Sequence, residues 1–112
     1  MADSPRRTEI WLADLSDPIG HEAAYLRPVL VVSDDPANRY GLATICPIGS
    51  AKRGYPTRVE VTAGPSGLDQ ASYIQAEQVR TISSARLVHL LGRADITAMV
   101  EVERVLRLLL RL

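Results

Sequence analysis

The chain has 112 residues, 13 basic and 13 acidic side chains, and a hydrophobic content of 46%. These values are typical of one folded domain over residues 1–112, and they exclude disorder as the main state. One cysteine and two histidines exclude an internal disulfide and a Cys/His zinc site, so we expect no metal and no cofactor. No apolar run approaches the ~18 residues of a membrane span, and no apolar segment follows the basic start, so we expect a cytoplasmic protein without membrane contact.

Six short segments have the apolar patterns of β-strands and are separated by turn signals. The segments are 9–15, 27–33, 42–48, 57–62, 72–81 and 86–91. The fourth alternates, with Val59 and Val61 on one face. Asp17-Pro18 marks a turn inside the connection 16–26, whose length is typical of functional loops. The succession predicts a small β-barrel or sandwich.

The chain ends in one amphipathic helix. Asp95 is a favourable N-cap for it. An apolar stripe then recurs at helical spacing; its residues are Met99, Val102, Leu106 and Leu109, widened by Ile96, Val105 and Leu112. Leu108 and Leu110 lie off this stripe, and they either pack on a partner chain or are simply exposed.

Charge is segregated along the chain although its sum is zero. Residues 36–59 contain no acid but hold Arg39, Lys52, Arg53 and Arg58. This segment is either a local nucleic-acid patch or a solvated loop whose charges are balanced in space. Neither the segment 49–54 nor the segment 64–67 has the spacing of a phosphate-binding loop or a nucleophile elbow.

The order of several segments resembles the MazF/PemK/Kid family of toxin ribonucleases. The segments are Glu9-Ile10-Trp11-Leu12-Ala13-Asp14-Leu15, Gly20-His21-Glu22, Arg27-Pro28-Val29-Leu30-Val31-Val32-Ser33, Glu77-Gln78-Val79-Arg80-Thr81 and Leu91-Gly92-Arg93. The resemblance implies a mainly β, SH3-like barrel of the CcdB/PemK type with a C-terminal α-helix. It also implies a homodimer that cleaves single-stranded RNA at short motifs without a metal, as the toxin of a type II toxin–antitoxin pair. The implied partners are RNA, a cognate antitoxin protein and, through the antitoxin complex, operator DNA.

Three residues match catalytic positions of the family. Arg27 precedes the Pro-Val strand, where a guanidinium suits an anionic phosphorane; the alternative is an ion pair with Asp17 or Glu22. His21 is either an acid/base group or an ordinary loop histidine. Glu77 has a carboxylate that orients Arg27 or accepts a proton.

One departure from the family falls on a catalytic position. Gly49 stands where the family carries a threonine, so the hydroxyl is missing. Ser50 supplies one if the backbone shifts, Gly49 offers its N–H to a phosphate instead, or the site is weakened. Gln75 also replaces an arginine that some relatives use. The alternative function is therefore a weakened or inactive member that binds RNA or antitoxin.

The remaining predictions concern RNA contacts and residues outside the site. The expected RNA-binding residues are Glu22, Tyr25, Lys52, Arg53, Arg58 and Gln78. Tyr25 stacks on an unpaired base or packs on the barrel, and Gln78 with Arg80 also suits a role in the fold or the dimer. We interpret Cys46 as buried apolar filling and His89 as structural. A third possibility, a gyrase-poisoning toxin, is disfavoured by the chain's last four residues.

Overall fold

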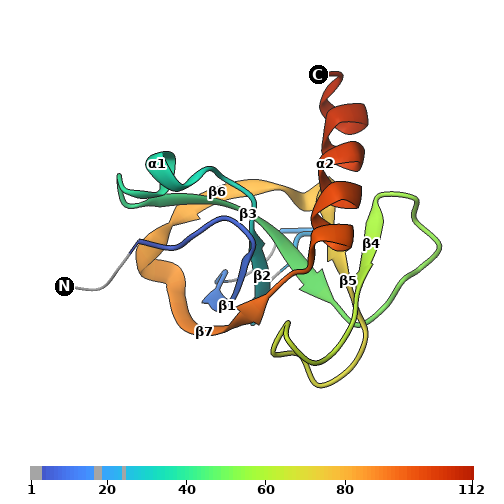
Figure 1. Ribbon diagram of the computed structural model, residues 1–112, viewed down its shortest axis with the longest axis horizontal. Helices are drawn as coiled ribbons and strands as arrows, with labels where there is room; N and C mark the ends of the chain where they lie inside the picture. Colours follow the sequence, from blue (N-terminus) through green and yellow to red (C-terminus); the bar gives the residue numbers. More distant parts are fainter. Residues whose placement is uncertain (1–3, 17–18, 24) are drawn as a thin grey trace.

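The computed structural model describes residues 4–16, 19–23 and 25–112, so the predicted turn at Asp17-Pro18 lies outside the described residues. Seven strands form the bulk of the fold (Figure 1): β1 (Glu9–Asp14), β2 (Leu26–Val31), β3 (Leu42–Gly49), β4 (Arg58–Val61), β5 (Ser72–Gln75), β6 (Arg80–Ser83) and β7 (Leu87–Arg93). The helices are α1 (Asp35–Asn38), the 3-10 helices η1 (Ala76–Gln78) and η2 (Ser84–Arg86), and the long C-terminal α2 (Ile96–Leu110). The predicted mainly β fold with a C-terminal helix is confirmed.

Strand β3 is the centre of the sheet. The strand order is β4-β5-β3-β2-β1-β7, and every pairing is antiparallel. On one side β3 pairs with β2. On the other side its first half pairs with β6, from Leu42 to Ile45, and its last two residues pair with β5. This change of partner marks where the sheet bends and places the end of β3 beside the start of β5.

The turn between β4 and β5 crosses β7 at very short range. The backbone N–H of Arg93 donates to Pro65 O at 3.0 Å. A Cβ on Gly92 would overlap the carbonyl groups of Pro65 and Ser66, and a Cβ on Gly67 would overlap Leu91 O. Glycine at both positions therefore lets the two backbones touch, and this contact joins the two ends of the bent sheet.

Gly92→Ala is expected to lower the free energy of unfolding by about 3 kcal/mol, because the added methyl meets backbone that cannot rotate away. A urea titration followed by circular dichroism measures the loss. Gly41→Ala is the control, since Gly41 has φ +79° but open space around its Cβ position. A loss at Gly92 no larger than the loss at Gly41 would contradict the close contact.

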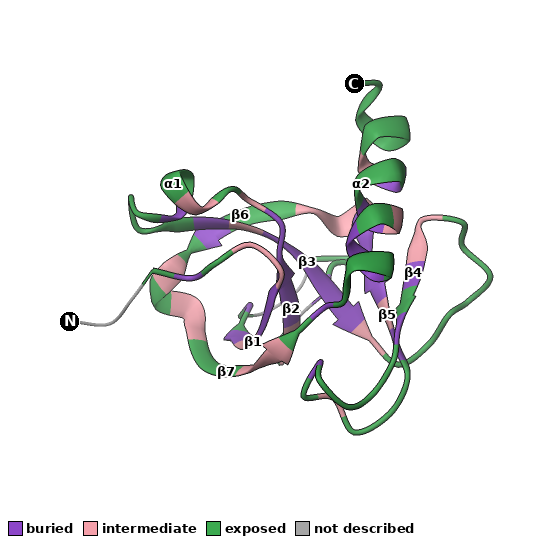
Figure 2. Cartoon of the chain, in the orientation of Figure 1, coloured by how far each residue is buried: buried purple, intermediate pink, exposed green. Residues whose placement is uncertain are grey.

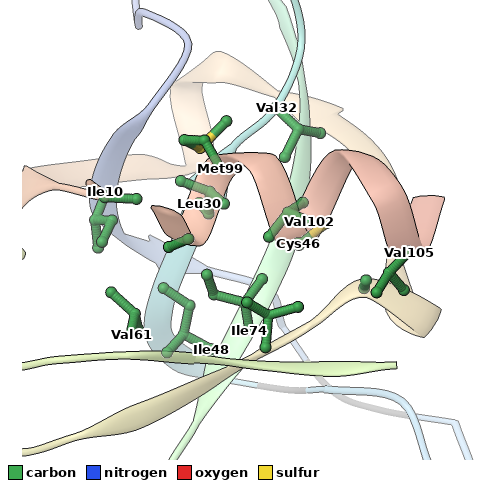
Figure 3. Close-up of a cluster of buried hydrophobic side chains, with 14 residues drawn as sticks. Ile10, Leu30, Val32, Cys46, Ile48, Val61, Ile74, Met99, Val102 and Val105 are labelled. Carbon is green, nitrogen blue, oxygen red and sulfur yellow. The ribbon is translucent and has the colours of Figure 1, made fainter. Parts of the chain in front are cut away.

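Both faces of the central strands are buried, in two apolar clusters. Alternation along β2 sends Leu30 to one face and Val29 and Val31 to the other. The first face packs under α2, where Met99, Val102 and Val105 meet Leu30, Cys46, Ile48, Val61 and Ile74 (Figure 3). The second face packs against Ala13, Leu15, Ala23, Ala43, Ile45 and Ile82. Burial raises the pKa of the Cys46 thiol to about 12, which agrees with its interpretation as apolar filling.

The predicted strand 72–81 is wrong as one element. Polar residues interrupt it, and the chain turns through η1 before it re-enters the sheet as β6. The pairing register with β3 differs between the two halves, with Ile48 opposite Ile74 but Ile45 opposite Arg80, and one regular strand cannot change register in this way. This break places Glu77 and Gln78 on a turn.

The start of α2 is confirmed, but its predicted apolar stripe is too long. The Asp95 carboxylate accepts a hydrogen bond from Ala98 N at 2.8 Å. Leu109 and Leu112 are 42% and 83% exposed, however, and Ile96 is 82% exposed. The last turns of α2 extend past the sheet, as the green end of the helix in Figure 2 shows. No helix in the described ranges is both long and apolar enough to cross a membrane.

Candidate functional site

A polar hollow lies between the loop 19–23, strand β2, the segment 53–58 and the turn η1. Its volume is about 830 Å³, and a smaller hollow of about 320 Å³ adjoins it beside the end of β3. Arg27, Arg53, Arg58 and Gln75 line both. We name the two together the arginine hollow.

The arginine hollow is basic although the chain is neutral. Arg80 also lines the larger part, so four arginines face two glutamates, Glu22 and Glu77. A concave surface lined mainly by charges of one sign concentrates their electric field. The arrangement is suited to an anion that carries several negative charges.

The Arg58–Glu77 ion pair forms the floor of the hollow. Arg58 Nε donates to Glu77 Oε2 at 2.8 Å, and Arg58 Nη2 lies 2.7 Å from the same oxygen. Thr57 Oγ1 donates to Glu77 Oε1 at 2.8 Å, and the Arg58 guanidinium lies over the Tyr55 ring. The Arg58 side chain is only 6% exposed. It therefore holds β4 to η1 as well as contributing charge.

These contacts also determine the protonation state of Glu77. Burial raises the pKa of its carboxyl, but the hydrogen bonds from Arg58 and Thr57 outweigh burial, and the pKa lies below its usual value. The carboxylate is therefore ionised at neutral pH. A carboxylate stabilised in this way is a weak base, which favours a supporting role over proton abstraction.

Glu77→Gln is expected to destabilise the protein at pH 7 and to matter less in acid. The pKa of Glu77 is lower in the folded protein than in the unfolded chain, where it is about 4.3. The ionised carboxylate therefore stabilises the fold above the unfolded-state pKa, and this stabilisation is lost as the pH falls through the folded-state pKa. The difference in urea midpoint between Glu77→Gln and wild type should be smaller at pH 3 than at pH 7. Glu60→Gln, on the exposed face of β4, is the control. A gap that stays constant would contradict the pairing.

The loop 19–23 is fastened to the barrel by Gln78. Gln78 Oε1 accepts from Ala23 N, and Gln78 Nε2 donates to His21 O at 3.2 Å. The Glu22 carboxylate accepts from Ile19 N at 2.8 Å, which closes a turn within the loop. His21 and Glu22 are thereby held at the rim of the arginine hollow.

Arg27, Gly49 and Gln75 meet where the two parts of the hollow join. A Cβ on Gly49 would lie 2.6 Å from Gln75 Nε2 and 3.7 Å from Arg27 Nη1. Ser50 is exposed and lines the smaller part of the hollow. The space beside Gly49 is therefore filled by the Gln75 amide and bordered by the Arg27 guanidinium and by Ser50.

The structure brings most of the expected site residues together. All four catalytic candidates line the arginine hollow: His21, Arg27, Ser50 and Glu77. Of the expected RNA contacts, Glu22, Arg53, Arg58 and Gln78 also line it. Tyr25 is 61% exposed with φ +59°, and neither Tyr25 nor Lys52 is among the lining residues. His89 is exposed on β7, away from the hollow.

Sequence reasoning missed two supports of the site, Tyr55 and Thr57. Both contact the Arg58–Glu77 pair from the segment just before β4. The only signal was their closeness in sequence to Arg58. Within the described residues no three His, Cys, Asp or Glu side chains form a group that could hold a metal ion.

Comparison with known proteins identifies the family. Residues 6–110 match the family model described as "PemK-like, MazF-like toxin of type II toxin-antitoxin system". The chain is 37% identical over 110 residues to the endoribonuclease MazF9 of Mycobacterium tuberculosis, a match that covers 92% of this chain and 93% of that protein.

Solved structures show the same fold. The crystal structure of MazF (Form-I) from Deinococcus radiodurans superposes with a TM-score of 0.88 at 26% identity, covering 99% of this chain and 100% of that one. The MazE-MazF (Form-II) structure from the same organism gives 0.83 at 27% identity and covers 99% of each chain. With its barrel, its basic hollow and a family match along almost its whole length, the chain belongs to the PemK-like, MazF-like toxins of type II toxin–antitoxin systems.

Proposed function

We propose that this protein is a sequence-specific endoribonuclease that cleaves single-stranded RNA in the arginine hollow without a metal ion. The observation that carries the proposal is the gathering of four arginines, Arg27 among them, in one hollow with His21, in a chain of zero net charge. Its similarity to the M. tuberculosis endoribonuclease agrees with it. Such an enzyme acts in the cytoplasm, where its substrate is.

The chemistry uses the substrate's own 2′-hydroxyl as the nucleophile. This oxygen attacks the adjacent phosphorus, the bond to the 5′-oxygen breaks, and the products are a 2′,3′-cyclic phosphate and a 5′-hydroxyl. Arg27 stabilises the charge of the phosphorane with several N–H donors, and Arg53 and Arg80 attract the neighbouring phosphates. We assign the proton transfers to His21, because it lines the hollow and an imidazole can both accept and donate a proton.

Glu77 and Gln78 support this machinery. The Glu77 carboxylate is committed to Arg58 and Thr57, so we assign it to holding Arg58 in the floor of the hollow. Gln78 holds the loop that carries His21. Ser50 lies beside the scissile phosphate in this arrangement and offers a hydroxyl to it.

Two protein partners follow from the family. We infer a cognate antitoxin that covers the arginine hollow, since the similar D. radiodurans toxin is solved with MazE. We also infer a homodimer, because Leu108 and Leu110 at the free end of α2 are 67% and 53% exposed. Light scattering of the purified toxin measures the dimer, and a monomer at micromolar concentration would contradict it.

The proposed function is tested by incubating purified protein with a long single-stranded RNA in EDTA. Discrete fragments are expected, and mapping of their ends gives the sequence motif. The same RNA annealed to its complement is the control and should stay intact. Intact single-stranded RNA that still binds the protein would contradict the enzyme and favour the binding module that Gly49 first suggested.

A further inference from the structure

Gln75 has an unusual environment for a glutamine. It is the last residue of β5, the residue is only 7% exposed, and it lines both parts of the arginine hollow. Its Oε1 atom is buried and has no hydrogen-bond partner among the described residues. A buried amide oxygen without a partner is costly, so its presence in a native protein calls for an explanation, and a role in catalysis is one.

Gln75 also explains why position 49 is glycine. Gly49 pairs with Tyr73 across the antiparallel β3–β5 ladder, and Gln75, two residues further along β5, is its diagonal neighbour on the same face. Any side chain at position 49 would enter the space that Gln75 Nε2 occupies. The backbone of Gly49 does not lie in the left-handed region, so steric room, not backbone conformation, favours glycine there. The glycine at position 49 and the glutamine at position 75 therefore depend on each other, because the Gln75 amide takes the space that a side chain at position 49 would need.

We propose that Gln75 is a substrate-binding catalytic residue whose carboxamide takes the place of the hydroxyl missing at position 49. This inference rests on the proposed ribonuclease function. Amides carry an acceptor and a donor side by side. In RNA the 2′-hydroxyl and the adjacent phosphate are likewise neighbours. Gln75 Oε1 accepts a hydrogen bond from the 2′-hydroxyl, and Gln75 Nε2 donates to a phosphate oxygen beside Arg27.

The assignment accounts for the unpartnered oxygen. A carboxamide is not a base, so Gln75 removes no proton; it orients the nucleophile toward phosphorus while another group accepts the proton. The donor that Oε1 lacks in the free protein is supplied by the substrate when the carboxamide turns toward the hollow that Gln75 lines. RNA differs from DNA in this hydroxyl, so Gln75 also gives the hollow a means of preferring RNA.

The first test replaces Gln75 by leucine, which has a similar length but neither donor nor acceptor. Single-turnover cleavage of an RNA oligonucleotide in EDTA should slow by about 10²-fold, with KM changed far less. The melting temperature should stay the same or rise, because an unpartnered buried amide is removed. Gln70→Leu, exposed in the β4–β5 connection, is the matched control and should cleave normally.

The second test restores threonine at position 49. Gly49→Thr alone should slow cleavage, because the new side chain displaces the Gln75 amide. The double variant Gly49→Thr with Gln75→Ala should recover activity, since the threonine then has room. This non-additive result is the signature of a shared site.

The outcomes separate this inference from the proposed function. Cleavage by wild type but equally fast cleavage by Gln75→Leu overturns the role of Gln75 and leaves the ribonuclease intact. If Gly49→Thr alone cleaves faster than wild type, glycine weakens the site, and the proposed role of Gln75 is again overturned. An inert wild type overturns the ribonuclease and the inference together.

Discussion

Replacement of Arg27 by alanine is expected to slow RNA cleavage by about 10²–10³-fold, which corresponds to about 3–4 kcal/mol of lost transition-state stabilisation. Arg27 is one of the three arginines that line both parts of the hollow, and its Nη1 atom would lie 3.7 Å from a Cβ on Gly49. Its strand pairs with β1 through backbone hydrogen bonds, with Arg27 opposite Ala13. The fold should therefore survive the change.

Single-turnover rates with a labelled RNA measure this effect, and circular dichroism checks the fold. Arg27→Lys keeps the charge but loses the planar fork of donors, so its rate should lie between those of wild type and alanine. Arg39→Ala is the matched control, because Arg39 is exposed next to α1 and does not line the hollow. Equal rates for Arg27→Ala and Arg39→Ala would contradict the assignment.

Replacement of Arg58 by methionine is expected to cost about 3 kcal/mol of stability, the lower end of the loss when one partner of a buried ion pair is removed, because the Glu77 side chain is 25% exposed. The change leaves the partly buried Glu77 carboxylate with Thr57 as its remaining side-chain partner. It also releases η1 from β4. Chemical denaturation at pH 7 measures the loss. RNA cleavage should also fall, because the Arg58–Glu77 pair that supports the hollow is gone.

Two further variants show whether the loss comes from the pair. Arg104→Met breaks an ion pair whose partners, Arg104 and Glu101, are about half exposed on α2, and it should change little. Adding Glu77→Leu to Arg58→Met removes the uncompensated charge, so most of the stability should return. A loss at Arg58 no larger than that at Arg104 would contradict a buried pair.

Local sequence patterns predicted the strands and the helix start because the physics behind them is local. Alternation along 58–61 appears as buried Val59 and Val61, and Asp95 caps α2 with its own carboxylate. The interruption of 72–81 was not predictable in this way. It depends on the bend of β3, which pairs with β5 at one end and β6 at the other.

For the candidate site, the sequence likewise predicted individual residues but not the contacts between distant segments. Arg27, His21 and Glu77 were found through the family resemblance, and the structure places all three on one hollow. That Arg58 is a buried partner of Glu77 could not be read from the sequence, since 19 positions separate the two residues. The link between Gly49 and Gln75 likewise required two strands to be placed side by side.

The most direct test of the whole account is the chemistry of the cut ends. RNA cleaved in EDTA should carry a 5′-hydroxyl on one product and a 2′,3′-cyclic phosphate on the other, since the substrate's own 2′-hydroxyl is the nucleophile. An RNA with 2′-deoxy sugar at the cleavage position should resist. Products with a 5′-phosphate, or cleavage of the 2′-deoxy substrate, would show that water attacks instead and would contradict the mechanism assigned to the arginine hollow.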